Sequence, residues 1–160
     1  MAIDTFIKME GIKGESHDHK HKDEIDVISW HWGAVNPSTA SHGGGLGAGK
    51  VSFRDLIFVH HYDKASPLLM LACANGTHIK QIKLYNRKQG RDQHEYLIVT
   101  IDDCLITGCH VADSGARQLP IEQVSVAFSK ISIDYKDQKA DGALNAAVRM
   151  GWDVKQNKQV

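Results

Sequence analysis

A phosphate-binding loop is the first chemistry that the residues suggest, in the stretch SHGGGLGAGK. Gly44, Gly49 and Lys50 have the G-x-x-x-x-G-K spacing of loops whose backbone N–H groups hold nucleotide phosphates. Such a loop follows a buried strand, carries Ser or Thr directly after the lysine to bind Mg²⁺, and opens a helix. Here Val51 follows the lysine, polar residues precede the glycines, and the alternation that comes after is typical of a strand. We therefore expect no nucleotide binding, and the sequence predicts no cofactor.

Histidines at alternate positions offer a metal site as the second chemistry. His17, His19 and His21 in SHDHKHKDE would lie on one side of an extended chain, where three imidazoles could ligate Zn²⁺ or Ni²⁺. Lysines and aspartates crowd the same stretch, and no carboxylate can be named that would orient the rings, so a solvated loop is the favoured interpretation. His60 and His61 are adjacent and point to opposite faces of an expected strand. The sequence predicts no functional metal site and assigns these five histidines no role.

Residues for acid–base or covalent catalysis are present but not arranged for it. There is no G-x-S-x-G elbow, and Cys73 lies in an apolar segment where a thiolate is disfavoured. Asp102 and Asp103 point to opposite faces of an expected strand, so they form no acid and base pair. Cys104 and Cys109 also lack C-x-x-C spacing, and all three cysteines are interpreted as reduced apolar fillers. We expect a protein that is not an enzyme.

Composition is that of one ordinary globular domain over residues 1–160, with 42% hydrophobic and 24% charged residues. Nineteen basic and nineteen acidic residues cancel, so no bulk field attracts nucleic acid, which is not an expected partner. The longest apolar run, residues 68–74, has seven residues, where a membrane helix needs about 20. The first residues lack the apolar core of a signal peptide. We expect synthesis in the cytoplasm and no membrane insertion.

The elements that must position these residues are almost all strands. Alternating or β-branched stretches are separated by turn-rich sequences such as KQGRDQ and ADSGARQLP, which predict antiparallel hairpins. A change of parity near Ser129 or Lys130 predicts a bulge. The expected strands are 2–9, 24–32, 51–62, 79–87, 94–109, 124–136 and 148–154.

One helix is expected in KASPLLMLACANG, with Ser66 as its cap, Pro67 at its first position and Gly76 in its left-handed stop. It is apolar enough to plug one end of a barrel. A glycine-rich stretch from Gly33 to Gly49 is the long loop of the chain. The predicted fold class is therefore mainly β: a small antiparallel β-barrel with one short α-helix and a long glycine-rich loop.

Five separated motifs make the chain resemble the haemolysin-coregulated protein family of type VI secretion. The resemblance covers essentially the whole chain, in order and without large insertions. The motifs are MAIDTFIKMEGIKGES, HKDEIDVISWHWG, HGGGLGAGKV, DKASPLLMLACANGTH and DQKADGALNAAVRMGWDVKQN. None of them is a catalytic signature.

The resemblance implies a structural and transport role. It implies a homohexameric ring, stacked with other rings into the inner tube that a contractile sheath propels from the cell. A spike protein would cap the tube, and small effector proteins would travel in its lumen. It also implies a bacterial protein made without a signal peptide and exported to the medium or a target cell.

With this resemblance, the glycine-rich stretch is interpreted as an assembly arm between subunits or rings. Glycine permits the close backbone approach and the positive φ angles that such docking requires. The residues assigned to this arm are Ser41, His42, Gly43, Gly44, Gly45, Leu46, Gly47, Ala48, Gly49 and Lys50.

Cargo contacts are expected on the strand that contains EIDVISWHWG. Ile28, Trp30 and Trp32 are assigned to its buried face, because two tryptophans bring a large apolar area. Ser29 and His31 on the other face are candidate lumen-facing contacts to an effector. Solvent or a neighbouring subunit is an equal alternative, because Ile25 and Val27 share that face and indicate that part of it is covered. A different class of function also stays open, a monomeric β-barrel that binds a ligand or metal. Mass in solution separates the two classes.

Overall fold

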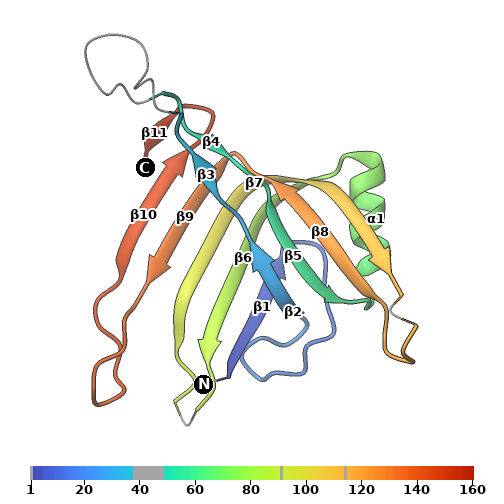
Figure 1. Ribbon diagram of the computed structural model, residues 1–160, viewed down its shortest axis with the longest axis horizontal. Coiled ribbons are helices and arrows are strands. Elements are labelled where there is room, and N and C mark those ends of the chain that lie inside the picture. The colour runs from blue at the N-terminus through green and yellow to red at the C-terminus, as the bar shows by residue number, and fades with distance from the viewer. Residues whose placement is uncertain (1, 38–48, 91, 114) are drawn as a thin grey trace.

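A computed structural model of the chain describes residues 2–37, 49–90, 92–113 and 115–160, and the structural statements below concern these residues (Figure 1). Strands dominate, as the alternation in the sequence predicts, and there is one helix among the described residues. The elements are β1 (Ile3–Met9), β2 (Ile25–His31), β3 (Ala34–Val35), β4 (Ser52–Phe53), β5 (Leu56–His61), α1 (Ser66–Asn75), β6 (His78–Lys88), β7 (Glu95–Ala112), β8 (Ile121–Ala127), β9 (Lys130–Tyr135), β10 (Val148–Asp153) and β11 (Lys158–Gln159).

Six antiparallel strands close into a barrel in the order β7, β6, β1, β2, β5 and β8, with β8 pairing back onto β7. Strands β9, β10 and β11 continue the sheet away from the barrel as a wing (Figure 1). β7 serves both parts, because its residues 97–102 pair with β9 and its residues 105–112 pair with β8. The predicted antiparallel β-barrel with one helix is confirmed, and the two turn-rich stretches do join hairpins, β6 to β7 and β7 to β8.

The irregularity predicted near Ser129 and Lys130 is a break between two strands. The segment expected as one strand over 124–136 is β8 followed by β9, and both run along the same edge of β7. Opposite the break, Asp103 has a φ of 52°, which interrupts the regular pleat of β7. The Ser129 hydroxyl donates to Asp103 Oδ2 at 2.8 Å, and the Ser129 N–H donates to the Asp102 carbonyl at 3.0 Å. These bonds fix the point where the chain passes from the barrel to the wing.

The strand expected over 51–62 is also divided. Arg54 and Asp55 separate β4 from β5, so that prediction is wrong in its continuity. β4 pairs with β3 in a separate two-stranded ribbon, and the Arg54 N–H donates to the Gly33 carbonyl at 2.8 Å. Phe53 packs between Trp32 and Phe128, with ring centroids 6.2 and 6.1 Å away, which holds the ribbon on the barrel.

The core lies inside the barrel and is formed by alternate residues of its strands. Each fully buried apolar side chain of this core stabilises the fold by roughly 1.5–3 kcal/mol relative to an exposed one. Leu69 and Ala72 of α1 join this core, and Ser66 at the start of the helix is buried as well. The strand residues at its centre are Ile7, Ile25, Leu56, Phe58, Ile82, Leu84, Val99, Ile101, Val124, Val126 and Ile131.

The helix begins at Ser66, one residue earlier than expected. Ala65 is the N-cap and makes no side-chain capping bond, so the assignment of Ser66 as cap is wrong. The Ser66 hydroxyl instead accepts the N–H of Asp63, within the turn that precedes the helix. The C-terminal end of the helix is as predicted, because Gly76 has a φ of 67° in the left-handed region. No helix of the described residues has the length and apolar composition needed to cross a membrane.

Candidate functional site

The candidate cargo strand is β2, and a bulge divides it. Val27 pairs with His60 and Ser29 pairs with Val59, so one residue of β2 is left over between them. Val27 packs on the core before the bulge, and Trp30 packs on it after the bulge. Ile28 is 53% exposed. The assignment of Ile28 to the buried face with the tryptophans is therefore wrong, because the bulge shifts the alternation by one residue.

Ser29 and His31 both lie on the exposed side of β2. Because of the bulge, Ser29 and His31 lie on the opposite face of β2 from Val27, which packs on the core. Val27 therefore does not cover part of their face, and that expectation is wrong. His31 also lines a depression of about 390 Å³ together with Arg54 and Asp55, the two residues between β4 and β5. These two residues are thus available to a partner outside the barrel.

The glycine-rich arm falls mostly outside the described residues. Ser41 to Ala48 are among the residues that the structure does not describe. Gly49 and Lys50 are described, and the Gly49 N–H donates to the Pro37 carbonyl at 3.1 Å. A Cβ at Gly49 would lie 2.6 Å from that carbonyl oxygen, so this position requires glycine. The ribbon of β3 and β4 forms the base from which the arm departs.

The wing carries an apolar face that nothing in the described part of the chain covers completely. Ile133, Tyr135, Val148 and Met150 are cross-strand neighbours on this face, which we call the wing face. Val148 is 70% exposed, Tyr135 45% and Met150 41%. Nearer the barrel the same face continues into Ile131, which is fully buried. An exposed apolar patch that extends from a core is typical of a surface that binds another protein.

The opposite face of the wing is polar. Arg149 and Asp134 are cross-strand partners there, with Arg149 Nε 3.4 Å from Asp134 Oδ1. The wing is therefore amphipathic, with one face suited to water and one suited to burial. A second exposed apolar surface lies on α1, where Leu68, Met70 and Leu71 are 46%, 44% and 57% exposed.

The histidines divide into exposed and buried ones. His17, His19 and His61 are exposed, and no group of metal-ligating side chains occurs among the described residues. His21 and His60 are 2% and 0% exposed, so the interpretation of His21 as part of a solvated loop is wrong. His60 and His61 do point to opposite faces of their strand, as expected.

His60 is buried because a carboxylate from another strand meets it. His60 Nε2 lies 2.9 Å from Glu122 Oε2, and both side chains are fully buried. The two residues are cross-strand partners on β5 and β8. Asp63, in the turn before α1, lies farther away, with Oδ1 3.9 Å from His60 Nδ1. A sequence signal for this pair is lacking, because Glu122 is far from His60 along the chain.

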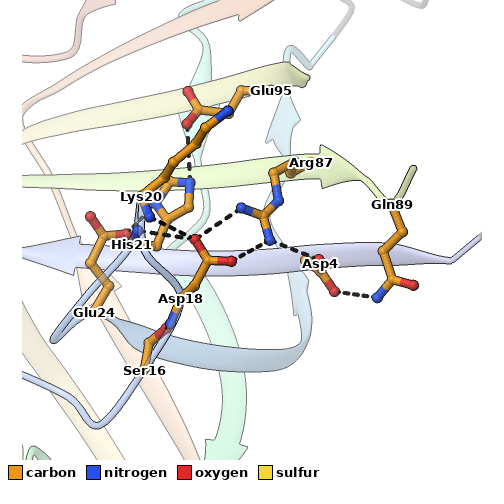
Figure 2. Close-up of polar contacts among 9 residues, drawn as sticks. All are labelled: Asp4, Ser16, Asp18, Lys20, His21, Glu24, Arg87, Gln89 and Glu95. Atoms are coloured by element: carbon orange, nitrogen blue, oxygen red, sulfur yellow. Dashed lines mark hydrogen bonds and ion pairs between the residues drawn. The ribbon is translucent and has the colours of Figure 1, made fainter. Parts of the chain in front are cut away.

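His21 belongs to a segment that crosses the outside of the barrel, residues 13–24, which we call the strap (Figure 2). His21 stacks on Phe6 with ring centroids 4.3 Å apart, and its Nδ1 lies 2.7 Å from Glu24 Oε2. His21 Nε2 lies 3.0 Å from Glu95 Oε1 but makes no hydrogen bond within the described residues. Burial raises the pKa of Glu24, and the hydrogen bond from His21 acts against that rise.

Arg87 fastens the strap to the barrel (Figure 2). Its guanidinium donates to both oxygens of Asp18, at 3.0 and 2.6 Å, and to Asp4 at 3.0 Å. The same guanidinium lies 5.0 Å from the ring centroid of Phe6. Arg87 holds the pKa of Asp18 far below its usual range, chiefly through these hydrogen bonds. Phe6, which is outside the barrel core, is thus covered by His21 and by Arg87.

The cysteines are free thiols. Cys104 is fully buried, and burial raises the pKa of both Cys104 and Cys109 to about 12. A thiol with such a pKa is almost entirely protonated at neutral pH and is a poor nucleophile. The interpretation of the cysteines as reduced fillers is confirmed for their redox state.

Comparisons with known proteins agree on one family. Residues 6–135 match the family described as "Type VI secretion system effector, Hcp". Protein hcp1 of Pseudomonas aeruginosa is 44% identical over 161 residues, which covers 99% of each chain. The crystal structure of Hcp1 from Salmonella typhimurium is 38% identical, with a TM-score of 0.82 over 100% of both chains. A structure described as a type six secretion system protein is 28% identical, with a TM-score of 0.95 over 99% of this chain and 100% of the other.

The family model spans the strap, the barrel and β9, and the relative from Pseudomonas aeruginosa covers β10 and β11 as well. The resemblance identified from the sequence is therefore confirmed, and with it a component of type VI secretion. The chain belongs to the Hcp family of type VI secretion system proteins.

Proposed function

We propose that this protein is the subunit of a type VI secretion tube, in which six copies form a ring, rings stack, and effector proteins travel in the lumen. Membership of the Hcp family supports the tube role. The observation that carries the proposal is the wing face, where Val148, Met150 and Tyr135 are exposed beside a well-packed core. Burial of this apolar surface against a neighbouring subunit would remove it from water, which favours assembly.

A ring requires that one surface of a subunit meets a different surface of the next. Such a head-to-tail contact closes when the rotation between subunits fits a whole turn. The wing face supplies one apolar surface, and the exposed side of α1, with Met70 and Leu71, supplies a second. A stable interface buries roughly 800 Å² on each partner, so both surfaces need neighbouring residues to reach that area.

Adding two positive charges to the wing face is expected to dissociate the ring. The variant Val148→Lys with Met150→Lys would force charged groups into an apolar interface, and each buried unpaired charge costs several kcal/mol. In native mass spectrometry the parent is expected near six times 17.7 kDa. The variant is expected as a monomer at the same micromolar concentration.

The control places the same added charge on the polar face of the wing, in Ser132→Lys with Asp134→Asn. Ser132 lies opposite Gly151 on that face, so this variant should keep the mass of the parent. A monomeric parent would refute the ring and favour the alternative, a monomeric ligand-binding or metal-binding barrel. A parent ring that survives in both variants would show that the wing face is not the interface.

Effector retention is expected to depend on Ser29 and His31. Each lies on the exposed side of β2, and six weak polar contacts around an axis would add up by multivalency. Ser29→Gln or His31→Gln should leave the ring mass unchanged and lower recovery of a co-expressed effector at least about fivefold, because one polar contact contributes up to about 1 kcal/mol and the variant changes it in all six subunits. His17→Gln, an exposed histidine of the strap, serves as the control. Parent-like recovery with both variants would exclude these residues from the cargo surface.

The remaining features of the proposal concern the partners and the export of the tube. Sheath and spike proteins of the secretion system would contact the assembled tube, and the protein would leave the producing cell with it. Residues 41–50 remain a prediction for the contact between subunits or between rings. The proposed role is structural and needs no catalysis or cofactor, in keeping with thiols that burial keeps protonated.

A further inference from the structure

A groove of about 960 Å³ lies between the strap and the end of β1, and we call it the strap groove. Its walls come from three parts of the chain: the end of β1 with the turn that follows it, the strap, and the start of the α1 region. The lining residues are Lys8, Met9, Glu10, Gly11, Ile12, Lys13, His19, Lys20, Lys22, Asp23, Glu24, Lys64 and Leu68.

The strap groove is basic in a chain whose net charge is zero. Five of its residues are lysines and one is a histidine, whereas three are acidic. Two of the carboxylates are already engaged, since Asp23 lies 3.8 Å from Lys64 Nζ and Glu24 is bound to His21. The other four lysines have no ion-pair partner within the described part of the chain. They therefore present positive charge that the protein itself does not neutralise.

A lysine pair on the barrel wall adds to this charge. Lys8 of β1 is the direct cross-strand partner of Lys83 on β6. Like charges directly opposite each other on a sheet destabilise the pairing, and a bound anion relieves that repulsion. Lys8 and Lys83 also line a smaller depression with Glu10 and Tyr85, which continues the strap groove along the outside of the sheet.

The groove is formed without a ligand, because its outer wall is rigidly held. The Gly14 N–H donates to the Asp23 carbonyl at 2.9 Å, and the Ser16 N–H donates to the Glu24 carbonyl at 3.0 Å. A Cβ at Gly14 would lie 2.5 Å from the Glu24 carbonyl oxygen, so the two ends of the strap pack in direct backbone contact. Arg87 then fixes the middle of the strap through Asp18. A preformed site avoids the entropic cost of ordering a loop on binding.

We propose that the strap groove binds an acidic segment of a partner polypeptide, one that carries carboxylates beside an apolar side chain. The unpaired lysines would receive the carboxylates by charge complementarity. Ile12 and Leu68 offer the apolar side chain a place, since Leu68 is 46% exposed and Ile12 is half-buried. Glu10 in the lining, the one carboxylate there not already engaged within the described residues, would repel the evenly spaced charges of a phosphate backbone, whereas a peptide can place an uncharged residue next to it. A peptide therefore fits this groove better than a nucleic acid.

The test is fluorescence anisotropy of a labelled synthetic peptide of repeated Glu-Glu-Leu, titrated with the full chain at low ionic strength. Saturable binding is expected, and it should weaken as salt is added, because exposed charges are screened over about 10 Å at 0.1 M salt. The matched Gln-Gln-Leu peptide should bind at least about tenfold more weakly. No saturable binding of the acidic peptide would overturn the proposal. Tighter binding of a single-stranded DNA of equal charge would overturn it in favour of a polyphosphate ligand.

Two charge-reversal variants locate the binding. Lys20→Glu with Lys22→Glu changes exposed residues of the strap and is expected to weaken peptide binding about tenfold. Lys80→Glu with Lys158→Glu makes the same change in net charge at exposed sites that do not line the groove, and should stay within about twofold of the parent. Equal losses in the two variants would assign binding to net charge and overturn the proposal.

A third variant tests the apolar contact, and a mass measurement distinguishes an acidic peptide from a second copy of this chain as the occupant of the groove. Leu68→Ala keeps every charge. It is expected to weaken binding of the Glu-Glu-Leu peptide while leaving the salt dependence of the affinity unchanged. Circular dichroism checks that all variants stay folded. If Lys20→Glu with Lys22→Glu dissociates the protein's own oligomer and the control does not, the groove holds a second copy of this chain and the proposal is wrong. The test does not depend on ring formation, so its failure leaves the proposed tube role untouched.

Discussion

Replacing His60 with alanine is expected to lower the free energy of unfolding by about 3–5 kcal/mol. His60 and Glu122 are both fully buried, with 2.9 Å between Nε2 and Oε2. Glu122 Oε1 has no hydrogen-bond partner among the described residues, so the histidine is the main group that satisfies this carboxyl. Removal of the imidazole leaves an unpaired buried acid and a cavity between β5 and β8.

The neighbouring histidine provides the control. His61 is adjacent on β5 but exposed, and His61→Ala is expected to change stability by less than about 0.5 kcal/mol. Urea denaturation at one fixed protomer concentration measures both variants, because assembly makes apparent stability depend on concentration. Glu122→Gln should be milder than His60→Ala, since the amide keeps the shape and can still bond to the imidazole. Equal, small losses for His60→Ala and His61→Ala would show that the buried pair is unimportant.

Replacing Arg87 with methionine is expected to cost about 2–3 kcal/mol, less than the loss of His60. Arg87 is 2% exposed, but Asp18 and Asp4 are 18% and 27% exposed and can be partly rehydrated when the guanidinium is gone. Methionine keeps most of the apolar contact with Phe6, so the change reports mainly on the hydrogen bonds. The strap should become accessible to proteolysis, because these bonds fasten it to the barrel.

The same variant should alter the dependence of stability on pH. In the folded protein Arg87 depresses the pKa of Asp18 below its value in the unfolded chain, which is about 4. The stabilisation from Asp18 is therefore fully present above about pH 4 and is lost as the pH falls toward the folded pKa. Arg87→Met removes this depression, so its stability should fall less steeply in acid than that of the parent.

Urea midpoints between about pH 2 and pH 7 measure this slope. Lys80→Met, an exposed residue of the same strand, is the control and should keep the parental profile. An unchanged acid slope in Arg87→Met would contradict the assignment of Asp18 to Arg87.

Most strands could be predicted because their side chains alternate between the core and the outside. Where the alternation breaks, the cause lies in the pairing and not in the sequence of the strand itself. Between Val27 and Ser29 the pairing with β5 shifts by one residue, and this shift turns Ile28 outward. Arg54 and Asp55 similarly interrupt an apparently continuous strand, since β4 pairs with β3 outside the barrel.

The surfaces of interest could be predicted only in part. The alternation separates Ser29 and His31 from the tryptophans, and both residues are exposed. The alternation also puts Val27 on their face, which is wrong because the pairing with β5 shifts by one residue. His21 is buried against Phe6 and His60 is buried beside Glu122, and both partners are distant in the sequence, so a local pattern of histidines could not show this burial. The wing face was missed because alternation in the strand at 148–154 does not reveal which face another chain would cover.

β7 is a single backbone that belongs to both the barrel and the wing. Six of its residues pair with β9 and the residues beyond them pair with β8, so no linker separates the two parts. In mechanical terms the wing is a cantilever whose beam is built into the wall of the barrel. A force applied along the strands at the tip would load the hydrogen bonds of the ladder together, in shear, instead of opening them one after another. Asp103, held by Ser129 and Lys155, stiffens the point where the beam enters the wall. A subunit built in this way would resist a force along these strands with little deformation.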